Sequence, residues 1–513
     1  MHFLKDLPVL ILGLGASGLA MARWCARWGA DVTVWDSREE PPQAGALGLE
    51  VPTARRVASL SLPQAPGLIL KSPGLGPHDP LIAPLLDEAR ASGIAVLGEL
   101  DLFVRALADL KVDRGYAPQL LAITGTNGKT TTTAMTALLV ARAGRRVATA
   151  GNIGPTLLDT LAASMDDLPA VWVLELSSFQ LEGGGSGVRG FEPDAATVLN
   201  VTQDHLDWHG SMAAYVAAKA RIFGTQAVMV INGDDPLVTA MVPAPAPVHV
   251  KGKVKGKPVE RRVLRFGLDA PRRPGDFGLV VENGMAWLVR ALPVDETARR
   301  SRRGAADVEE EIHLQRLMPA AALRVRGRHN AANALAALAL ATAIGCPLAP
   351  MLHGLREYTG EPHRVQWVAT VGEVEAYDDS KGTNVGATVA ALDGLGTDKA
   401  PARLVVILGG DGKGQDFAPL AAPLARHARA VATIGRDAAA VEAAIETTLG
   451  AVPVQRHATL EAAVAWCFEQ AQPGDAVLLS PACASLDMFS GYGHRAEVFV
   501  QAVQALAHER GQA

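Results

Sequence analysis

Short apolar runs recur along the whole chain, and a stretch suited to a helix follows most of them. Residues 9–12, 120–123 and 404–408 are three such runs, and each leads into a glycine-containing turn. Continuous apolar runs without polar alternation predict strands that are covered on both faces, as in parallel sheets. The alternation of strands and helices therefore predicts an α/β protein with largely parallel sheets.

The apolar runs fall into three series, which predict three domains. A chain of 513 residues is too long for one ordinary core. We place an N-terminal Rossmann-like domain at 1–108, a central domain at 109–360 and a C-terminal Rossmann-like domain at 361–513. The polar stretch 109–118 suits a linker. The charge run at 296–311 suits a solvated, mobile insertion in the central domain.

The charge balance and the cysteines exclude several classes of protein. The 48 basic and 53 acidic residues give a net charge of -5, so we expect neither nucleic acid nor an anionic membrane as a partner. No apolar run of about 18 residues suits a membrane span, and we expect no signal peptide. Cys25, Cys346, Cys467 and Cys483 are scattered, which predicts reduced core residues of a cytoplasmic protein.

The strand at 120–123 runs through a glycine turn into a threonine-rich helix start. Backbone N–H groups of such a turn face a phosphate, Lys129 would neutralise the β- and γ-phosphate oxygens, and the Thr130 hydroxyl would bind Mg²⁺. Ile123 stands where the strict Walker pattern has glycine, and an ordinary glycine turn is the alternative. The central domain is thus predicted to be a P-loop ATPase domain. The nucleotide contacts predicted in this loop are Gly125, Thr126, Asn127, Gly128, Lys129, Thr130 and Thr131.

Two polar residues follow strands of the same predicted sheet. Glu175 ends the apolar strand 171–174, and His205 lies shortly after the strand at 196–199. Taken alone, each could be a helix cap or a polar residue whose hydrogen bonds are made within the fold. Open α/β sheets place their ligands at the carboxyl ends of the strands, where the phosphate loop also lies. We therefore interpret Glu175 and His205 as metal ligands.

The first domain carries a G-x-G-x-x-G match at residues 13–18, at the opening of a helix. Asp36 ends the next strand, where an acid that binds a ribose belongs. Alone, this pattern indicates a nicotinamide dehydrogenase. The domain ends early, however, and no second half-sheet of the same type follows. The loop could equally hold the diphosphate of another nucleotide-linked substrate.

The third domain contains three polar loops that suggest anion binding. They are residues 378–384, 409–413 and 480–487, and the last two follow apolar strands. Their lysine, serine and threonine side chains could clamp an anionic amino acid or the phosphates of ATP. Surface loops without a role are the alternative for each of them.

Together and in this order, the motifs resemble those of the Mur ligase family of peptidoglycan synthesis, in which GTNGKT is the ATP loop. Residues 174–181, 379–384 and 480–487 are most similar to the branch that adds D-glutamate to UDP-N-acetylmuramoyl-L-alanine. The resemblance implies three α/β domains, ATP and two Mg²⁺ ions as cofactors, and a cytoplasmic monomer. It also implies that ATP phosphorylates the alanyl carboxylate and that the amine of D-glutamate then attacks the acyl phosphate.

The alternatives are another Mur ligase, a folylpolyglutamate synthase and a dehydrogenase. The synthase shares the ATP loop and the ligase chemistry, but the G-x-G-x-x-G domain is foreign to it. The dehydrogenase has no place for the Gly-Lys-Thr loop. A Mur ligase therefore accounts for more of the chain than either of the other two classes.

The resemblance also implies roles for residues in all three domains. The UDP-sugar substrate would contact Ala16, Ser17, Asp36, Ser37, Arg38, Ser72, Asn152 and Gln180. Beyond the loop, ATP would face Asn330, Asn333, Arg364, Asp379 and Lys381. D-Glutamate would face Thr383, Lys413, Ser485, Leu486 and Tyr492. The metal ligands would be Thr130, Glu175, His205 and Lys219, and the catalytic residues would be Lys129, Glu175, His205 and Lys219.

Lys219 lies in a helical stretch whose neighbours are apolar or small. By pattern alone, it is a lysine that extends to solvent along a helix face. Its position matches a lysine that Mur ligases carry as a carbamate. Burial would lower its pKa and raise the fraction of neutral amine that attacks CO₂. The resemblance therefore implies that Lys219 is carboxylated and binds Mg²⁺ through the carbamate oxygens.

Overall fold

The structure is a computed structural model, and it describes residues 2–63, 67–184, 187–244, 249–250, 253–254, 260–294, 311–325, 327–450 and 452–511. Three α/β domains follow one another along the chain, and their sheets are mostly parallel, which confirms the predicted fold class. Apart from Glu311, the predicted insertion at 296–311 lies outside the described residues. Every helix of the described part is too short or too polar to cross a bilayer.

The first domain is a parallel sheet in the order β3-β2-β1-β4-β5. Val9 and Ile11 of β1 belong to one apolar cluster and Leu10 and Leu12 to another, because successive side chains point to opposite faces. The sheet is therefore covered on both sides. Its strands are β1 (Pro8–Leu12), β2 (Asp31–Trp35), β3 (Arg55–Arg56), β4 (Leu68–Lys71) and β5 (Ala95–Leu97). Its helices are α1 (Ala16–Arg27), α2 (Ala44–Glu50) and α3 (Ala83–Ala91).

Helix α4 (Glu99–Arg114) leads from the first sheet into the central domain. The polar stretch 109–118, predicted as a linker, is instead helical as far as Arg114. The ring of Phe103 meets the ring of Trp172 edge to face, with 5.1 Å between the centroids. Burial of this apolar face against the central domain stabilises the helix beyond what its polar C-terminal sequence indicates.

The central domain is built on a nine-stranded sheet in the order β16-β15-β14-β13-β10-β9-β6-β8-β7. The strands from β7 to β14 pair in parallel, whereas β14, β15 and β16 form an antiparallel extension at one edge. The strands are β6 (Gln119–Thr124), β7 (Val147–Gly151), β8 (Val171–Glu175), β9 (Ala195–Val198), β10 (Val228–Asn232), β13 (Val263–Phe266), β14 (Phe277–Glu282), β15 (Met285–Pro293) and β16 (Ile312–Pro319). A separate two-stranded sheet pairs β11 (His249–Val250) with β12 (Lys253–Val254).

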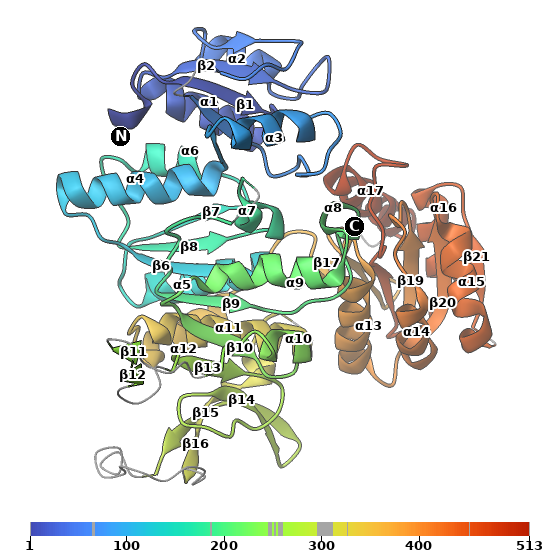
Figure 1. The fold of residues 1–513 in the computed structure, drawn as a ribbon. Helices are drawn as coiled ribbons and strands as arrows, with labels where there is room; N and C mark the ends of the chain where they lie inside the picture. The colour runs from blue at the N-terminus through green and yellow to red at the C-terminus, as the bar shows by residue number, and fades with distance from the viewer. Residues whose placement is uncertain are drawn as a thin grey trace.

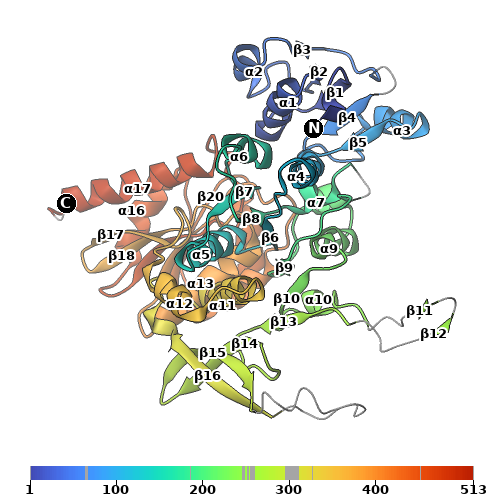
Figure 2. The same ribbon diagram turned by 90° about the vertical axis from the view of Figure 1, so that its left-hand side faces the viewer.

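Helices cover both faces of the central sheet (Figure 2). One face packs on the alanine-rich helix α11 because short side chains let a helix lie close to the strands. The helices of this domain are α5 (Lys129–Arg142), α6 (Leu157–Ala163), α7 (Ser178–Glu182), α8 (Leu206–His209), α9 (Met212–Ala220), α10 (Pro236–Thr239), α11 (Arg328–Ala343) and α12 (Leu348–Glu357).

The C-terminal domain has a six-stranded sheet in the order β17-β18-β22-β19-β20-β21. Only the β17–β18 hairpin is antiparallel among the described pairings of this sheet. The strands are β17 (Gln366–Val371), β18 (Val374–Asp378), β19 (Leu404–Gly409), β20 (Ala428–Ile434), β21 (Val454–Arg456) and β22 (Ala476–Leu479). The helices are α13 (Val385–Lys399), α14 (Ala421–His427), α15 (Ala438–Leu449), α16 (Leu460–Gln470) and α17 (Tyr492–Glu509).

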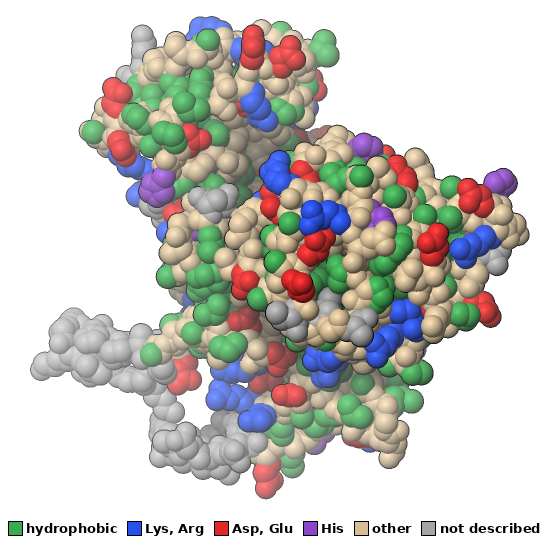
Figure 3. Space-filling view, turned by 90° about the vertical axis from the view of Figure 1, so that its right-hand side faces the viewer, with side chains coloured by type: hydrophobic (Ala, Val, Ile, Leu, Met, Phe, Trp, Pro, Cys, Tyr) green, Lys and Arg blue, Asp and Glu red, His purple; other side chains and the backbone are tan. Residues whose placement is uncertain are grey.

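The C-terminal domain lies beside the central domain (Figure 1), and α13 contacts α11. Figure 3 shows its outer face, where basic and acidic side chains are interspersed. The contact between these two domains brings residues that are far apart in the sequence to the carboxyl end of β6. The predicted phosphate loop lies at this end of the strand.

Candidate active site

The predicted phosphate loop connects β6 to α5 at residues 125–128. Gly128 has a φ of +81°, and a Cβ there would lie 2.7 Å from Asn333 Oδ1, so only glycine fits. The Lys129 ammonium group donates to the carbonyl oxygens of Gly125 and Thr126, at 2.9 Å each. The loop thus has the form that the sequence predicts, with the lysine folded back over its own turn.

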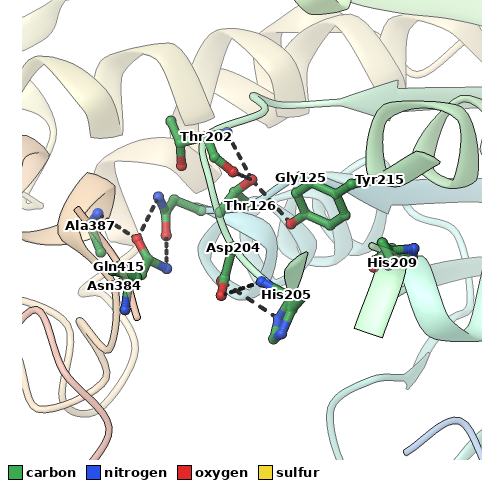
Figure 4. Close-up of polar contacts among 12 residues, drawn as sticks. Gly125, Thr126, Thr202, Asp204, His205, His209, Tyr215, Asn384, Ala387 and Gln415 are labelled. Carbon is green, nitrogen blue, oxygen red and sulfur yellow. Dashed lines mark hydrogen bonds and ion pairs between the residues drawn. The ribbon is translucent and has the colours of Figure 1, made fainter. Parts of the chain in front are cut away.

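A second lysine donates to the same loop. Lys219 on α9 is 2 % exposed, and its Nζ lies 2.9 Å from the Gly125 carbonyl oxygen. Burial lowers the pKa of Lys219 well below its ordinary value, and the nearby Lys129 lowers it further. The Tyr215 ring lies 4.5 Å from Lys219 Nζ, and its hydroxyl is 3.2 Å from Thr126 Oγ1 (Figure 4). Lys219 therefore lies inside the loop structure and does not extend to solvent.

Glu175, which interacts electrostatically with Lys129, has an unsatisfied carboxylate oxygen. It is the last residue of β8 and is 1 % exposed. Its Oε1 accepts a hydrogen bond of 2.9 Å from Asn152 Nδ2, whereas its Oε2 is buried without a partner among the described residues. A buried anionic oxygen without a partner is costly, so this position suits a cation. Mg²⁺ takes oxygen ligands of this kind.

His205 precedes α8 and has a left-handed backbone, with a φ of +53°. Its Nε2 is 3.5 Å from Asp204 Oδ2, and its ring packs against Phe179 with 4.8 Å between centroids. Burial lowers the pKa of His205, and Asp204 opposes this effect. In the described part of the chain, no three His, Cys, Asp or Glu side chains gather as a metal site. The metal role of Thr130, Glu175, His205 and Lys219 stays a prediction.

Polar residues of the C-terminal domain lie at the phosphate loop of the central domain. Arg364 Nη2 donates to Thr130 Oγ1 at 3.1 Å. Asp379 is 5 % exposed, and burial raises its pKa to about 7, although Ser480 and Arg364 oppose this shift. Its Oδ2 accepts a hydrogen bond of 2.7 Å from Ser480 Oγ.

Most of the residues predicted to face ATP line one small cavity of about 60 Å³ between the central and C-terminal domains. They are Asn127, Gly128, Thr131, Asn330, Asn333, Arg364 and Asp379. A neighbouring cavity of about 440 Å³ is also lined by Asn330 and Arg364. Lys381 lines neither cavity, and its Nζ lies 5.6 Å from the Tyr492 ring centroid. The tertiary structure therefore gathers one set of predicted residues at the loop, while Lys381 contacts Tyr492 and also interacts electrostatically with Arg364.

Close backbone contacts and hydrogen bonds hold the G-x-G-x-x-G loop of the first domain. A Cβ on Gly18 would lie 2.0 Å from the Gly13 carbonyl oxygen, so α1 can start here only with glycine. Asp36 Oδ2 accepts from the Leu14 N–H at 2.6 Å, and both oxygens accept from Arg38 at 2.8 Å. Arg38 holds the pKa of Asp36 at about 2. Ser72 Oγ donates to the Gly13 carbonyl oxygen at 3.0 Å.

The remaining residues predicted for the UDP-sugar lie around this loop and at the central domain. Ala16 and Ser17 begin α1, and Ser37 lies between Asp36 and Arg38. Gln180 forms a capping box with Ser177 at the start of α7. With Asn152, it lies near the carboxyl end of β8 and not with the first-domain loop.

The residues predicted for D-glutamate lie in loops of the C-terminal domain, except for Tyr492, which begins α17. The loops after β19 and β22 are joined by two backbone hydrogen bonds between Asp411 and Ala484, at 3.0 and 2.8 Å. Lys413 is exposed, with a φ of +51°, while Ser485 is 4 % exposed. Of the others, Leu486 is 72 % and Tyr492 41 % exposed, and Thr383 directly precedes α13's cap.

The sequence interpretation did not single out three residues that hold the loop. Tyr215 stands four residues before Lys219 on one helix face, a spacing that brings side chains together. Asn200 follows β9 at the carboxyl edge of the sheet, and Asn384 precedes an apolar helix as an N-cap. Those local signals could have identified all three residues, but none of them predicts a contact between domains.

Each of the three domains matches a part of one family. Residues 8–98 match "Mur ligase MurD-like, N-terminal domain", residues 123–263 match "Mur ligase middle domain", and residues 363–483 match "Mur ligase, glutamate ligase domain". The fold and the phosphate loop define a ligase of this class, and the chain belongs to the Mur ligase family. The resemblance inferred from the motifs is confirmed.

The curated relatives point to one member of the family. The chain is 58% identical to the UDP-N-acetylmuramoylalanine–D-glutamate ligase of Albidiferax ferrireducens, over 100% of this chain and 99% of that protein. It is 55% identical to the ligase of the same name from Burkholderia multivorans, over 98% of each chain. The solved structure of MurF ligase from Thermotoga maritima in complex with ADP has a similar fold, with a TM-score of 0.57 and 16% identity over 99% of this chain and 96% of that one.

Proposed function

We propose that this protein adds D-glutamate to the alanyl carboxylate of UDP-N-acetylmuramoyl-L-alanine, with ATP as the energy source. The near full-length relatives carry the name of that ligase. Their identity of more than half of all positions favours this member over other Mur ligases. A folylpolyglutamate synthase is disfavoured because residues 8–98 match a Mur ligase domain. The product would be a precursor of peptidoglycan.

One observation of the geometry carries this proposal. The Lys129 ammonium group lies over the phosphate loop, and the Arg364 guanidinium group reaches the first turn of α5. Cations placed this close together repel one another unless an anion lies among them. A nucleotide triphosphate supplies that anion, and the loop's N–H groups supply further donors. The site is therefore built for phosphoryl transfer.

In the first step, the alanyl carboxylate would attack the γ-phosphorus of ATP, and ADP would leave. The protein contributes position and charge neutralisation rather than covalent chemistry. Lys129 would turn from its own loop to the β- and γ-phosphate oxygens. Arg364 and Lys381 would offset the charge that develops as the phosphoryl group transfers. The product of this step is an acyl phosphate and ADP.

In the second step, the neutral amine of D-glutamate would attack the acyl carbonyl carbon. The tetrahedral intermediate would collapse to the amide and release inorganic phosphate. Lys413 and the hydroxyls of Thr383 and Ser485 would hold the carboxylates of the amino acid. The loops after β19 and β22 are tied together by the Asp411–Ala484 bridge, so Lys413 and Ser485 are positioned as one unit.

The donor set at the loop fits magnesium. Glu175 Oε2 is a buried oxygen without a partner among the described residues, and the Thr130 hydroxyl lies at the start of α5. Thr130, Glu175, His205 and a carboxylated Lys219 would hold two ions. When bound, Mg²⁺ supplies positive charge that offsets the phosphate oxygens. Burial, together with the neighbouring Lys129, lowers the pKa of Lys219 well below its ordinary value, which raises the fraction of neutral amine able to attack CO₂.

The test is phosphate release from ATP in the presence of UDP-N-acetylmuramoyl-L-alanine and one amino acid at a time. D-Glutamate should support turnover, whereas L-glutamate, L-lysine and meso-diaminopimelate should not. Product mass should rise by one glutamyl residue. Turnover with a different amino acid and none with D-glutamate would assign the chain to another branch of the family.

A further inference from the structure

Two asparagine side chains join the phosphate loop to the C-terminal domain. Asn127 Nδ2 donates to Asn384 Oδ1 at 3.2 Å, and Asn384 Nδ2 donates to Asn127 Oδ1 at 3.0 Å. The two residues are 257 positions apart in the sequence. A reciprocal pair of this kind requires two planar amides in one relative orientation. It therefore specifies a single register between the two domains.

Each amide is anchored to a rigid part of its own domain. The Asn127 N–H donates to Asn200 Oδ1 at 2.8 Å, and Asn200 Nδ2 donates back to the Asn127 carbonyl oxygen at 3.1 Å. Asn384 is the N-cap of α13, where its Oδ1 accepts from the Ala387 N–H at 2.9 Å. Because hydrogen bonds fix both asparagines within their own domains, the pair connects β9 and the loop rigidly to α13.

The backbone at the pair is close-packed as well. A Cβ on Gly386 would lie 2.8 Å from Thr202 Oγ1 and 3.1 Å from Asn127 Nδ2. Only glycine lets the first turn of α13 approach the phosphate loop this closely. The side-chain pair therefore lies at a point of direct contact between the two domains.

The connection continues from α13 to the loops proposed to bind the amino acid. The Val385 N–H donates to Gln415 Oε1 at 3.0 Å, and Gln415 Nε2 donates to the Gly412 carbonyl oxygen at 3.0 Å. Gly412 is next to Lys413, and Thr383 is next to Asn384. A shift of α13 relative to the phosphate loop would therefore move both ends of the amino-acid site.

We propose that Asn384 is a positioning residue that sets the distance between the amine of the incoming amino acid and the phosphate loop. It contacts neither reacting group and acts through Asn127. The inference rests on the proposed function, because it needs an acyl phosphate at the loop and an amine held by the C-terminal domain. Asn384 would bring the incoming amino acid, the second substrate, to the acyl phosphate formed in the first step.

The first test is Asn384→Ser, which keeps a good N-cap but cannot reach Asn127. We expect kcat/KM for D-glutamate to fall about tenfold, as two lost amide hydrogen bonds indicate. The KM for the UDP-sugar should stay unchanged, because the residues proposed to hold that substrate all lie in the first and central domains. Thr459→Ala is the control, since it removes the N-cap hydrogen bond of α16 and has no contact with the loop. It should lower the melting temperature and leave both constants unchanged.

The second test is a cycle with Asn127→Ala. If the two amides act through one another, Asn127→Ala with Asn384→Ser should be no worse than the poorer single variant. Additive losses would mean that each side chain acts separately, and they would overturn the proposal, as would a wild-type kcat/KM in Asn384→Ser. If the wild-type protein joins no amino acid, the proposed function fails instead. Small-angle scattering then decides the positioning role, because identical curves for wild type and Asn384→Ser would refute it.

Discussion

Replacing Lys219 separates its structural contribution from its chemical one. In Lys219→Ala, the Gly125 carbonyl oxygen loses one donor and keeps the 2.9 Å hydrogen bond from Lys129. The variant also removes a buried amine whose charged form is disfavoured by burial and by Lys129. These two effects oppose each other, so we expect the stability to change by about 1 kcal/mol or less. The loop and the fold should therefore survive the substitution.

The effect on activity should be much larger. Lys219 is 2 % exposed and lies on the carbonyl oxygen of the loop that would hold the phosphates. As a carbamate, it would be an anionic oxygen ligand for Mg²⁺ at a fixed position. Loss of one preorganised electrostatic group costs about 10²–10³ in turnover, or roughly 3–4 kcal/mol. Turnover of Lys219→Ala should fall by at least this factor.

The assay is phosphate release with and without added acetate or formate. In Lys219→Ala, the truncated side chain leaves room for a small carboxylate, which should restore part of the turnover. Lys219→Met is the matched control, because its side chain fills that space and cannot be carboxylated. It should be as inactive as Lys219→Ala and should not respond to formate.

Two results would refute this reasoning. One is a fully active preparation in which mass spectrometry under native conditions shows an unmodified Lys219. The other is Lys219→Met with near-normal turnover, because that outcome would show that no ligand is needed at this position. Equal formate rescue of both variants would place the added anion elsewhere in the site.

Three further predictions concern the other domains. Gly18→Ala should weaken binding of UDP-N-acetylmuramoyl-L-alanine without affecting ATP binding, because the added Cβ would lie 2.0 Å from the Gly13 carbonyl oxygen, and overpacking of this kind costs about 1–3 kcal/mol. Calorimetry on the wild-type protein should detect binding of the UDP-linked substrate and not of NAD. Binding of NAD alone would contradict the assignment of this domain. Lys413→Ala should raise the KM for D-glutamate much more than that for the UDP-sugar, and equal changes in both would place Lys413 elsewhere. Since Arg38 lowers the pKa of Asp36 to about 2 in the folded state, their pairing should stabilise the protein above about pH 4 and lose this contribution as the pH falls towards 2. Asp36→Asn should abolish this loss of stability in acid. The lost free energy of unfolding is about 1–2 kcal/mol, because Arg38 is half exposed and solvent screens the pair. Urea unfolding at pH 5 and pH 2.5 measures it.

Local sequence was sufficient for the buried parallel strands and for the phosphate loop. The runs at 9–12, 120–123 and 404–408 are buried strands in three sheets, because a continuous apolar run satisfies both faces of a parallel strand wherever it lies. The turn between β6 and α5 is equally local, since Gly128 is the residue that allows its left-handed backbone. Interactions between near neighbours thus determine these strands and the form of the loop.

Burial and contacts between domains depended on the tertiary structure. The apolar neighbours of Lys219 suit either a solvent-facing helix or a buried one, and only the packing of α9 against the loop places its Nζ on the Gly125 carbonyl oxygen. The polar stretch after residue 108 is helical because Phe103 and its neighbours on α4 pack against the central domain.

The Asn127–Asn384 pair shows the same dependence across 257 positions. Each asparagine has an ordinary local role, one in a turn and one as a helix cap. Their meeting is decided by how two separate sheets pack together. Local propensity carries no information about the distance between the two asparagines, because the sum of many side-chain contacts between the domains sets that distance.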